Sequence, residues 1–194
     1  MSDWWTAATG QGHEQGDLFR DLPVVHVDDV DLDGGPTVRT RIQTIDAIII
    51  TQTCDLENAK IRNILLARVL SWAEFSAAQY AAGNTAVRSS AFRRNLIRGD
   101  IPPLTLLHER VAQPRLAWSI VDFRELHIID RNVIDAFVTQ PGHRRRLRLT
   151  SPYREHFAQA FARFYMRVGL PHEAGPFEQA GRAAVEDLGR LPTA

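Results

Sequence analysis

The chain has 194 residues, with 23 basic and 23 acidic side chains and a formal net charge of zero. Its contents of 44% hydrophobic and 24% charged residues are those of an average globular domain, and they exclude a disordered tail, a collagen-like chain and a coiled-coil rod. No apolar stretch of about 18 residues is present, so we expect no membrane span, and the N-terminus lacks the apolar core of a signal peptide.

The single cysteine, Cys54, excludes an internal disulfide and a sulfur-rich zinc site. We therefore expect a cytoplasmic protein. No His-x-x-x-His pair or similar spacing supports a metal site, and no Gly-rich phosphate loop is present, so we expect no metal and no cofactor.

Charge is distributed unevenly along the chain. Residues 1–60 contain four basic and eleven acidic side chains, a net charge of −7, and the remainder carries +7. The basic residues concentrate in residues 88–98 and 143–148. Such runs can bind phosphate, pair with acidic segments of the same chain, or form a solvated surface. The zero net charge argues against a dedicated nucleic-acid binder.

The N-terminal third predicts an arm followed by strands. Residues 1–14 are expected to form a flexible arm, whose Trp4 and Trp5 dock back onto the domain. Residues 18–27 read as a first strand, in which Pro23 indicates an edge position or a bulge. A turn-rich loop follows at residues 31–36.

The central third predicts more strands and then helices. Residues 38–44 alternate as a half-exposed strand does, and the β-branched residues 47–50 indicate a buried central strand with residues 63–70 as its neighbour. Ser71 and Glu74 form a capping box that opens a helix ending near residue 82, and residues 85–98 read as a second short helix.

The C-terminal third predicts a strand at residues 118–129 with a kink near residues 124–125. Alternation at residues 146–149 places Arg146 and Arg148 on one face of a strand. A cap and a proline at residues 150–152 open a last helix with an aromatic stripe, which ends near residue 169.

This order of elements resembles the small SH3-like barrel of the PemK/MazF toxin family. The resembling features are Gly16-Asp17 before the first strand, the polar end of the central strand at residues 51–52, the long broken strand, and the C-terminal helix. The resemblance implies an α+β fold: a small, mostly antiparallel barrel of residues 15–170, with a helical insertion at about residues 72–115, a C-terminal amphipathic helix and a tail at residues 171–194.

The PemK/MazF resemblance also implies RNA chemistry, because that family cleaves mRNA without a metal. An arginine before the central strand stabilises the phosphate there, and a threonine or serine at the end of the next strand assists. Arg39 or Arg41 and Ser71 occupy these places. Ile45-Asp46 replaces the family's Arg-Pro pair, and an acid there repels phosphate. Ser71 is equally explained as a helix cap.

The chain also resembles, more loosely, uncharacterised bacterial proteins with three short motifs. Here these are the Gln-Gly-Asp motif of residues 15–17, the Thr-Gln-x-Cys-Asp-Leu motif of residues 51–56 and the Ser-Pro-Tyr-Arg-Glu-His motif of residues 151–156. The resemblance implies that the three segments meet in space. The candidate structural or ligand-contacting residues are Gln15, Asp17, Thr51, Gln52, Cys54 and Asp55.

Three functions therefore remain open. The first is an RNA-interacting protein of a bacterial toxin–antitoxin system, including a divergent or inactive endoribonuclease. Its nucleic-acid-binding candidates are Arg93, Arg94, Arg144, Arg145, Arg146, Arg148 and Arg154. The second is a non-catalytic protein-interaction or regulatory module of a conflict or signalling operon. The third is a cysteine hydrolase in which Cys54 is the nucleophile and a histidine the base. The expected partner is RNA or a protein, with a homodimer as a further option.

Overall fold

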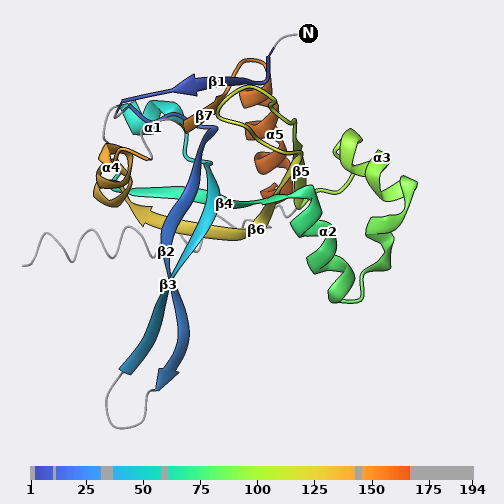
Figure 1. The fold of residues 1–194 in the computed structure, drawn as a ribbon, viewed down its shortest axis with the longest axis horizontal. Coiled ribbons are helices and arrows are strands. Elements are labelled where there is room, and N and C mark those ends of the chain that lie inside the picture. The colour runs from blue at the N-terminus through green and yellow to red at the C-terminus, as the bar shows by residue number, and fades with distance from the viewer. Residues whose placement is uncertain (1–2, 11, 32–36, 58–60, 143–145, 167–194) are drawn as a thin grey trace, which may run out of the picture. The chain divides into compact units, whose positions relative to one another are not determined.

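The structure is a computed structural model that describes residues 3–10, 12–31, 37–57, 61–142 and 146–166. The chain divides into residues 1–164 and residues 165–194, and the fold described below is that of the first unit. It is an α+β fold built on one antiparallel sheet (Figure 1). The predicted tail of residues 171–194 lies outside the described residues.

Seven strands form the sheet in the order β1-β7-β2-β3-β4-β6-β5. In chain order they are β1 Trp5–Ala8, β2 Asp17–Asp31, β3 Thr37–Ile49, β4 Asn63–Ser71, β5 Leu104–Leu107, β6 Ser119–Asp130 and β7 Arg146–Leu149. Among these described strands, β1 and β5 are the two edges and do not pair with each other. The sheet is thus open, which differs from the closed barrel that the sequence led us to expect.

Helices follow or cover the strands. They are α1 Thr53–Glu57, α2 Trp72–Ala81, the 3₁₀ helix η1 Thr85–Arg88, α3 Ser90–Arg98, α4 Arg131–Thr139 and α5 Tyr153–Tyr165. In the described residues no helix is both long enough and apolar enough to cross a lipid bilayer.

Both faces of the sheet are covered, because side chains alternate along each strand. Leu18 pairs with Ile48 on one face, in a core with Phe157 of α5. Phe19 pairs with Ala47 on the other face, in a core that contains residues of α1 and α4. A third core lies under the helical insertion formed by α2, η1 and α3.

Several predicted elements are confirmed. Residues 38–44 and 47–49 are parts of one strand, β3, which ends one residue before the predicted end at residue 50. The Glu74 N–H donates to Ser71 Oγ at 3.2 Å and the Ser71 N–H donates to Glu74 Oε2 at 2.9 Å, so the capping box forms. The predicted kink in β6 appears as a register shift, because Val69 pairs with Val121 but Ala67 pairs with Leu126.

Other elements differ from the prediction. Residues 1–14, expected as an arm, contain the edge strand β1, in which Trp5 pairs with Leu149 and is buried. Both tryptophans dock as expected: the Trp5 indole donates to the His108 carbonyl at 2.8 Å, and Trp4 stacks on Tyr153. The helical insertion ends at residue 98, since β5 returns to the sheet beside β6.

Candidate functional site

The Gln-Gly-Asp and Thr-Gln-x-Cys-Asp-Leu motifs lie against each other. The Gln15 side-chain amide donates to the Ile50 carbonyl at 2.7 Å, and its backbone N–H donates to Thr53 Oγ1 at 3.2 Å. Thr51 Oγ1 accepts from the backbone N–H of Leu65 at 2.8 Å. These bonds hold the start of β2 against the turn after β3, so the side chains of Gln15 and Thr51 stabilise the fold.

A buried ion-pair network joins this region to β7 and α5. Asp17 is fully buried and accepts from Arg146 Nε at 2.7 Å and from Arg148 Nη2 at 2.9 Å. Glu14 accepts from Arg148 and, at 2.7 Å, from Arg154 Nη1. We call these five residues the Asp17 network. It brings the third motif beside the first, so the three segments meet as the second resemblance implied.

The Asp17 network turns three predicted RNA-binding arginines inward. Arg146 is buried and also donates to the carbonyls of Gly10 and Gly12. Hydrogen bonding to Asp17 raises the pKa of Arg148, so its charge is firmly retained. Arg146 and Arg148 do share a strand face, but that face meets carboxylates of the same chain. Arg144 and Arg145 lie outside the described residues.

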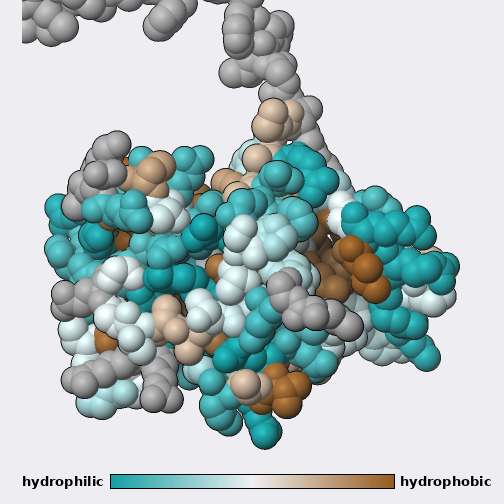
Figure 2. All heavy atoms as spheres, turned by 90° about the horizontal axis from the view of Figure 1, so that it is seen from above, coloured by the Kyte–Doolittle hydropathy of each residue, from teal (hydrophilic) through white to brown (hydrophobic). Residues whose placement is uncertain are grey.

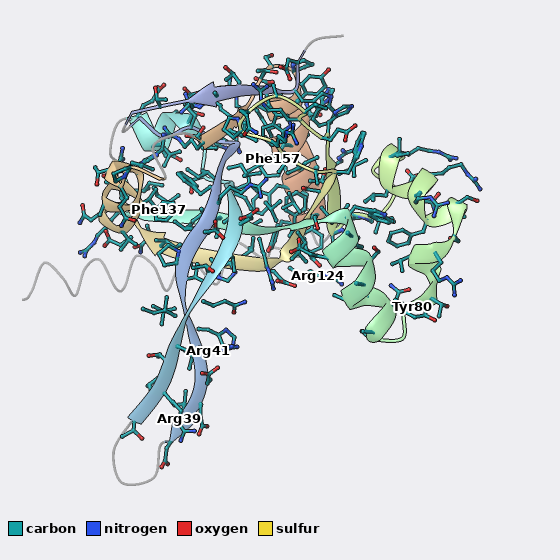
Figure 3. All side chains as sticks on the ribbon, viewed as in Figure 1. Arg39, Arg41, Tyr80, Arg124, Phe137 and Phe157 are labelled. Atoms are coloured by element: carbon teal, nitrogen blue, oxygen red, sulfur yellow. The ribbon has the colours of Figure 1, made fainter. Side chains whose placement is uncertain are left out.

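The residues matched to the toxin active site lie on different parts of the fold. Arg39 and Arg41 belong to the part of the β2–β3 hairpin that projects from the sheet (Figure 3). Arg41 Nε donates to Asp28 Oδ1 at 2.8 Å, and Arg39 Nη2 lies 4.0 Å from Asp29 Oδ2. Ser71, in contrast, ends β4 and caps α2. The structure gives Ser71 a capping role and gives both arginines acidic partners.

Asp46, which replaces the family's proline position, holds the base of the hairpin. It accepts from the Asp21 backbone N–H at 3.1 Å and lies 3.1 Å from Arg20 Nη1. Burial raises the pKa of Asp46 above its usual value, against the opposing effects of the Asp21 N–H and of Arg20. The carboxylate of Asp46 is therefore bound within the chain, at the base of the hairpin.

Cys54 lies in α1 with an exposed thiol that donates to Gln52 Oε1 at 3.7 Å. An amide oxygen does not remove a proton from a thiol, so this contact supplies no general base. The candidate histidines are dispersed over β2, the segment before β6, β6 and α5, at His26, His108, His127 and His156, and His143 is outside the described residues.

Asp55 lies in the first turn of α1. In the described residues, no group of three or more His, Cys, Asp or Glu side chains is placed to hold a metal ion.

The projecting half of the β2–β3 hairpin separates two kinds of side chain. Residues of β3 alternate, and each directly paired residue of β2 shares the face of its partner. The charged face carries His26, Asp28, Asp29, Arg39 and Arg41. The apolar face carries Val25, Val27, Val30, Val38 and Ile42, flanked by Pro23, Thr40 and Thr44.

The apolar face of the hairpin is exposed. Its five aliphatic side chains are between 50% and 77% exposed, with Ile42 the most exposed. The opposite end of the molecule, seen in Figure 2, is mainly hydrophilic with small, separate hydrophobic areas. The largest contiguous apolar patch on the surface of a monomer is often a functional surface. The apolar face is therefore the strongest candidate functional surface in the described residues.

The edges of the projecting hairpin are protected, whereas its face is not. Outside the body of the sheet neither strand has an outer neighbour among the described strands, since β2 pairs with β7 only at residues 17–18 and β3 with β4 only at residues 46–49. Pro23, the register shift next to Asp28 and the acidic side chains are features that discourage pairing with a further strand. Contact through the side chains of the apolar face is consequently favoured over addition of a strand.

The helical insertion carries a second polar surface. Arg88, Arg93 and Arg94 have no carboxylate within ion-pair distance among the described residues, and the Arg88 guanidinium lies 5.6 Å from the centre of the Tyr80 ring. Arg93 and Arg94 donate instead to the Arg88 carbonyl and to Ser90 Oγ. Of the predicted RNA-binding arginines in the described residues, Arg93 and Arg94 are the two without a carboxylate partner.

Comparison with known proteins adds no relative. No protein-family model matches the chain, and no match was found among curated proteins or among solved structures.

Sequence reasoning missed the apolar face of the hairpin. Alternation in residues 38–44 indicated one buried face, but that pattern is the same whether the apolar side meets a core or solvent. The signal present in the sequence was the position of the pattern, which flanks an acidic, turn-rich loop. The structure adds that both strands leave the sheet before they reach that loop.

Proposed function

We propose that this protein is a non-catalytic protein-interaction module that binds its partner through the apolar face of the β2–β3 hairpin. The observation that carries the proposal is a row of five exposed β-branched side chains on one face of a projecting two-stranded ribbon. Exposing them to water has a free-energy cost that binding relieves, at about 25 cal/mol per Å² of apolar surface. The internal pairing of Asp17, Arg41 and Arg146 supports the same view, because these charges are already neutralised.

Site-specific photocrosslinking tests this proposal. A photoreactive amino acid replaces Ile42 on the apolar face or, as the matched control, Arg39 on the charged face of the same strand. In cells that naturally make the protein, we expect the Ile42 variant to give a discrete crosslinked protein product and the Arg39 variant to give little. Equal products from both positions, or none from position 42, contradict the proposal.

RNA interaction is a second proposal, favoured by the unpaired arginines of the helical insertion. It carries with it the relationship to the PemK/MazF-like SH3 barrel. The antiparallel sheet and the helical insertion between β4 and β5 support that relationship, whereas the open edges of the described sheet do not. Arg93 and Arg94 are positioned for phosphate contacts, and Tyr80 offers an exposed ring on which a base can stack.

Filter binding with mixed single-stranded RNA at several salt concentrations tests the second proposal. We expect the Arg93→Ala/Arg94→Ala double variant to weaken binding and to lower the salt slope by about 0.7 per lost contact. Arg39→Ala/Arg41→Ala, which alters two arginines that have acidic partners, is the control. Metal-independent cleavage lost in the control variant points instead to a toxin-like nuclease centred on the hairpin.

A further inference from the structure

We propose that residues 12–16, which lead into β2, form a clasp that opens in acid: when His13 takes up a proton, the clasp detaches from α4 and from the Asp17 network while the sheet stays folded. The clasp is separate from the projecting half of the β2–β3 hairpin, so its opening does not depend on the proposed function. Residues 12–16 belong to neither a helix nor a strand. Segments of this kind open with less free energy than the whole domain requires to unfold.

Hydrogen bonds on both sides of His13 attach the clasp to the Asp17 network. The Gly12 carbonyl accepts from Arg146 and, at 3.0 Å, from Arg148 Nη2. The Glu14 carboxylate accepts from Arg148. Because His13 stands between Gly12 and Glu14, movement of its ring out of its site loosens the bonds of both neighbours.

The His13 ring is fully enclosed. Its side chain is 0% exposed, and Nε2 lies 2.7 Å from Asp135 Oδ1 on α4. The ring packs edge-on against Phe19, with 5.9 Å between the two ring centres. Nδ1 is buried and has no hydrogen-bond partner among the described residues. A neutral ring with its hydrogen on Nε2 donates to Asp135 and leaves Nδ1 as a bare acceptor.

The charged groups around the ring come from each element packed against it. They are Asp135 and Arg131 of α4, Asp17 of β2, Arg146 of β7 and, within the clasp, Glu14. Both carboxylates that attract a charged ring already have basic partners. Asp135 Oδ2 lies 3.8 Å from Arg131 Nε, and Asp17 Oδ2 accepts from Arg146 Nε at 2.7 Å. They therefore stabilise a charged ring less than unpaired carboxylates would.

Protonation of His13 is unfavourable in this closed site. It gives Nδ1 a hydrogen that has no acceptor among the described residues, and a buried unsatisfied donor carries the full cost of its desolvation. It also adds a positive charge near Arg146, whose guanidinium lies 5.9 Å from the centre of the same Phe19 ring. Burial lowers the pKa of His13 below 6.5; the bond to Asp135 opposes this shift, and the charge of Arg146 adds to it. In the open clasp the ring is hydrated, so a falling pH favours opening.

Amide hydrogen exchange of the full-length protein, measured by NMR at a series of pH values, is the first test. The Glu14 N–H donates to Asp17 Oδ2 at 3.1 Å and reports on the clasp, whereas the Ile50 N–H donates to the Leu65 carbonyl at 2.9 Å and reports on the sheet. After correction for intrinsic exchange rates, we expect the opening equilibrium at Glu14 to rise about three- to tenfold between about pH 7.5 and 5.5. Tenfold is the limit for one proton taken up with an unfolded pKa of about 6.5.

The same measurement shows whether the opening is local. At about pH 5.5, opening at Glu14 should be at least tenfold more frequent than opening at Ile50. Equal opening at the two positions overturns the proposal, because the whole domain then unfolds together. A rise of less than twofold at Glu14 overturns it as well.

The variant His13→Gln identifies the titrating group. Because glutamine does not titrate, the rise at Glu14 should shrink to less than twofold. His127→Gln is the matched control: burial lowers the pKa of His127 too, but this residue lies on β6, so the rise at Glu14 should be unchanged. An undiminished rise in His13→Gln overturns the proposal.

Asp135→Asn covers the case in which His13→Gln does not fold. The asparagine keeps an acceptor for the Nε2 hydrogen but lacks the negative charge that favours a charged ring, so the rise at Glu14 should approach the tenfold limit. A rise smaller than that of the unmodified protein contradicts the proposal.

The ¹⁵N chemical shifts of the His13 ring in the unmodified protein test the protonation step itself. We expect the closed form to keep a neutral ring, with its hydrogen on Nε2, at about pH 6. A ring that becomes charged near pH 6.5 while the Glu14 N–H stays protected overturns the proposal, since the closed site then accepts the proton.

Discussion

The two ends of strand β2 differ in which kind of side chain is buried and which is exposed. At its start Asp17 is fully buried and neutralised by Arg146 and Arg148, while apolar side chains lie beside it. Towards its end Val25 is 68% exposed, and the charged residues of the hairpin pair with each other on the opposite face. A buried charge and an exposed apolar row both lower the stability of an isolated domain unless something compensates.

The compensation differs between the two ends. The Asp17 network is compensated within the chain, because three segments far apart in sequence supply its hydrogen bonds. The apolar face of the hairpin has no such cover in the described residues, which is why we assign its compensation to another molecule. The proposed function thus places local stability and binding at opposite ends of one strand, and substitutions at each end should act on different measurements.

The largest effect is expected from Asp17→Asn. The substitution leaves Arg146 buried without a full counter-charge, and removing one partner of a buried pair costs about 3–5 kcal/mol. Asp29→Asn is the matched control: it makes the same chemical change on the same strand, where the side chain is exposed and its pair is worth less than about 1 kcal/mol. Urea denaturation of both variants measures the difference, and equal losses would show that the two ends are not distinct.

An intermediate effect on the free energy of unfolding, one that depends on pH, is expected from His13 in the segment before β2. The ring is buried, its Nε2 lies 2.7 Å from Asp135 Oδ1, and Nδ1 has no hydrogen-bond partner among the described residues. Burial lowers the pKa of His13 below 6.5, although the bond to Asp135 opposes that shift. The unfolded chain therefore binds the extra proton first, and the free energy of unfolding should fall as the pH decreases below about 6.5.

The variant His13→Gln separates this contribution from those of other groups. It should flatten the decrease in stability between 6.5 and the lowered pKa of the folded state, as followed by urea midpoints at a series of pH values. His127→Gln is the necessary comparison, because burial lowers the pKa of His127 as well. An unchanged pH profile in His13→Gln would show that other groups cause the pH dependence of stability.

The smallest effect on folding is expected at the exposed end. Val27→Thr should change the free energy of unfolding by less than about 0.5 kcal/mol when measured at concentrations at which the protein is monomeric. The side chain already faces solvent, and its cross-strand partner Thr40 remains in place. A loss of more than about 1 kcal/mol would mean that the apolar face packs against this chain after all.

Local signals in the sequence predict the elements better than their assembly. The capping box at Ser71 and the kink of β6 depend on neighbouring residues, and both are confirmed. The burial of Arg146 depends on Asp17, which lies 129 residues away, and nothing in the basic run of residues 143–148 distinguishes an internal partner from a phosphate. The edge strand β1 was missed for the same reason, since its partner β7 comes late in the chain.

Helix α4 shows a different limit. Its start is set by Asp130, whose side chain accepts from the Asn132 N–H at 2.9 Å directly after β6. The same aspartate also ends the strand, so the helix begins without a turn between the two elements. The polar residues 130–132 and the change from alternating to helical spacing mark the boundary, but the helix extends over only nine residues.

The placement of β7 has a consequence for synthesis of the chain. Asp17 and Trp5 leave the ribosome long before Arg146 and Leu149, their partners in the ion-pair network and the sheet. At about 5–20 residues per second, the interval is on the order of ten seconds. During this time the β2–β3 hairpin can already have formed, while the carboxylate of Asp17 is still hydrated. The pairing of β1 with β7, which completes that edge of the sheet, is therefore a late event in the folding of the nascent protein.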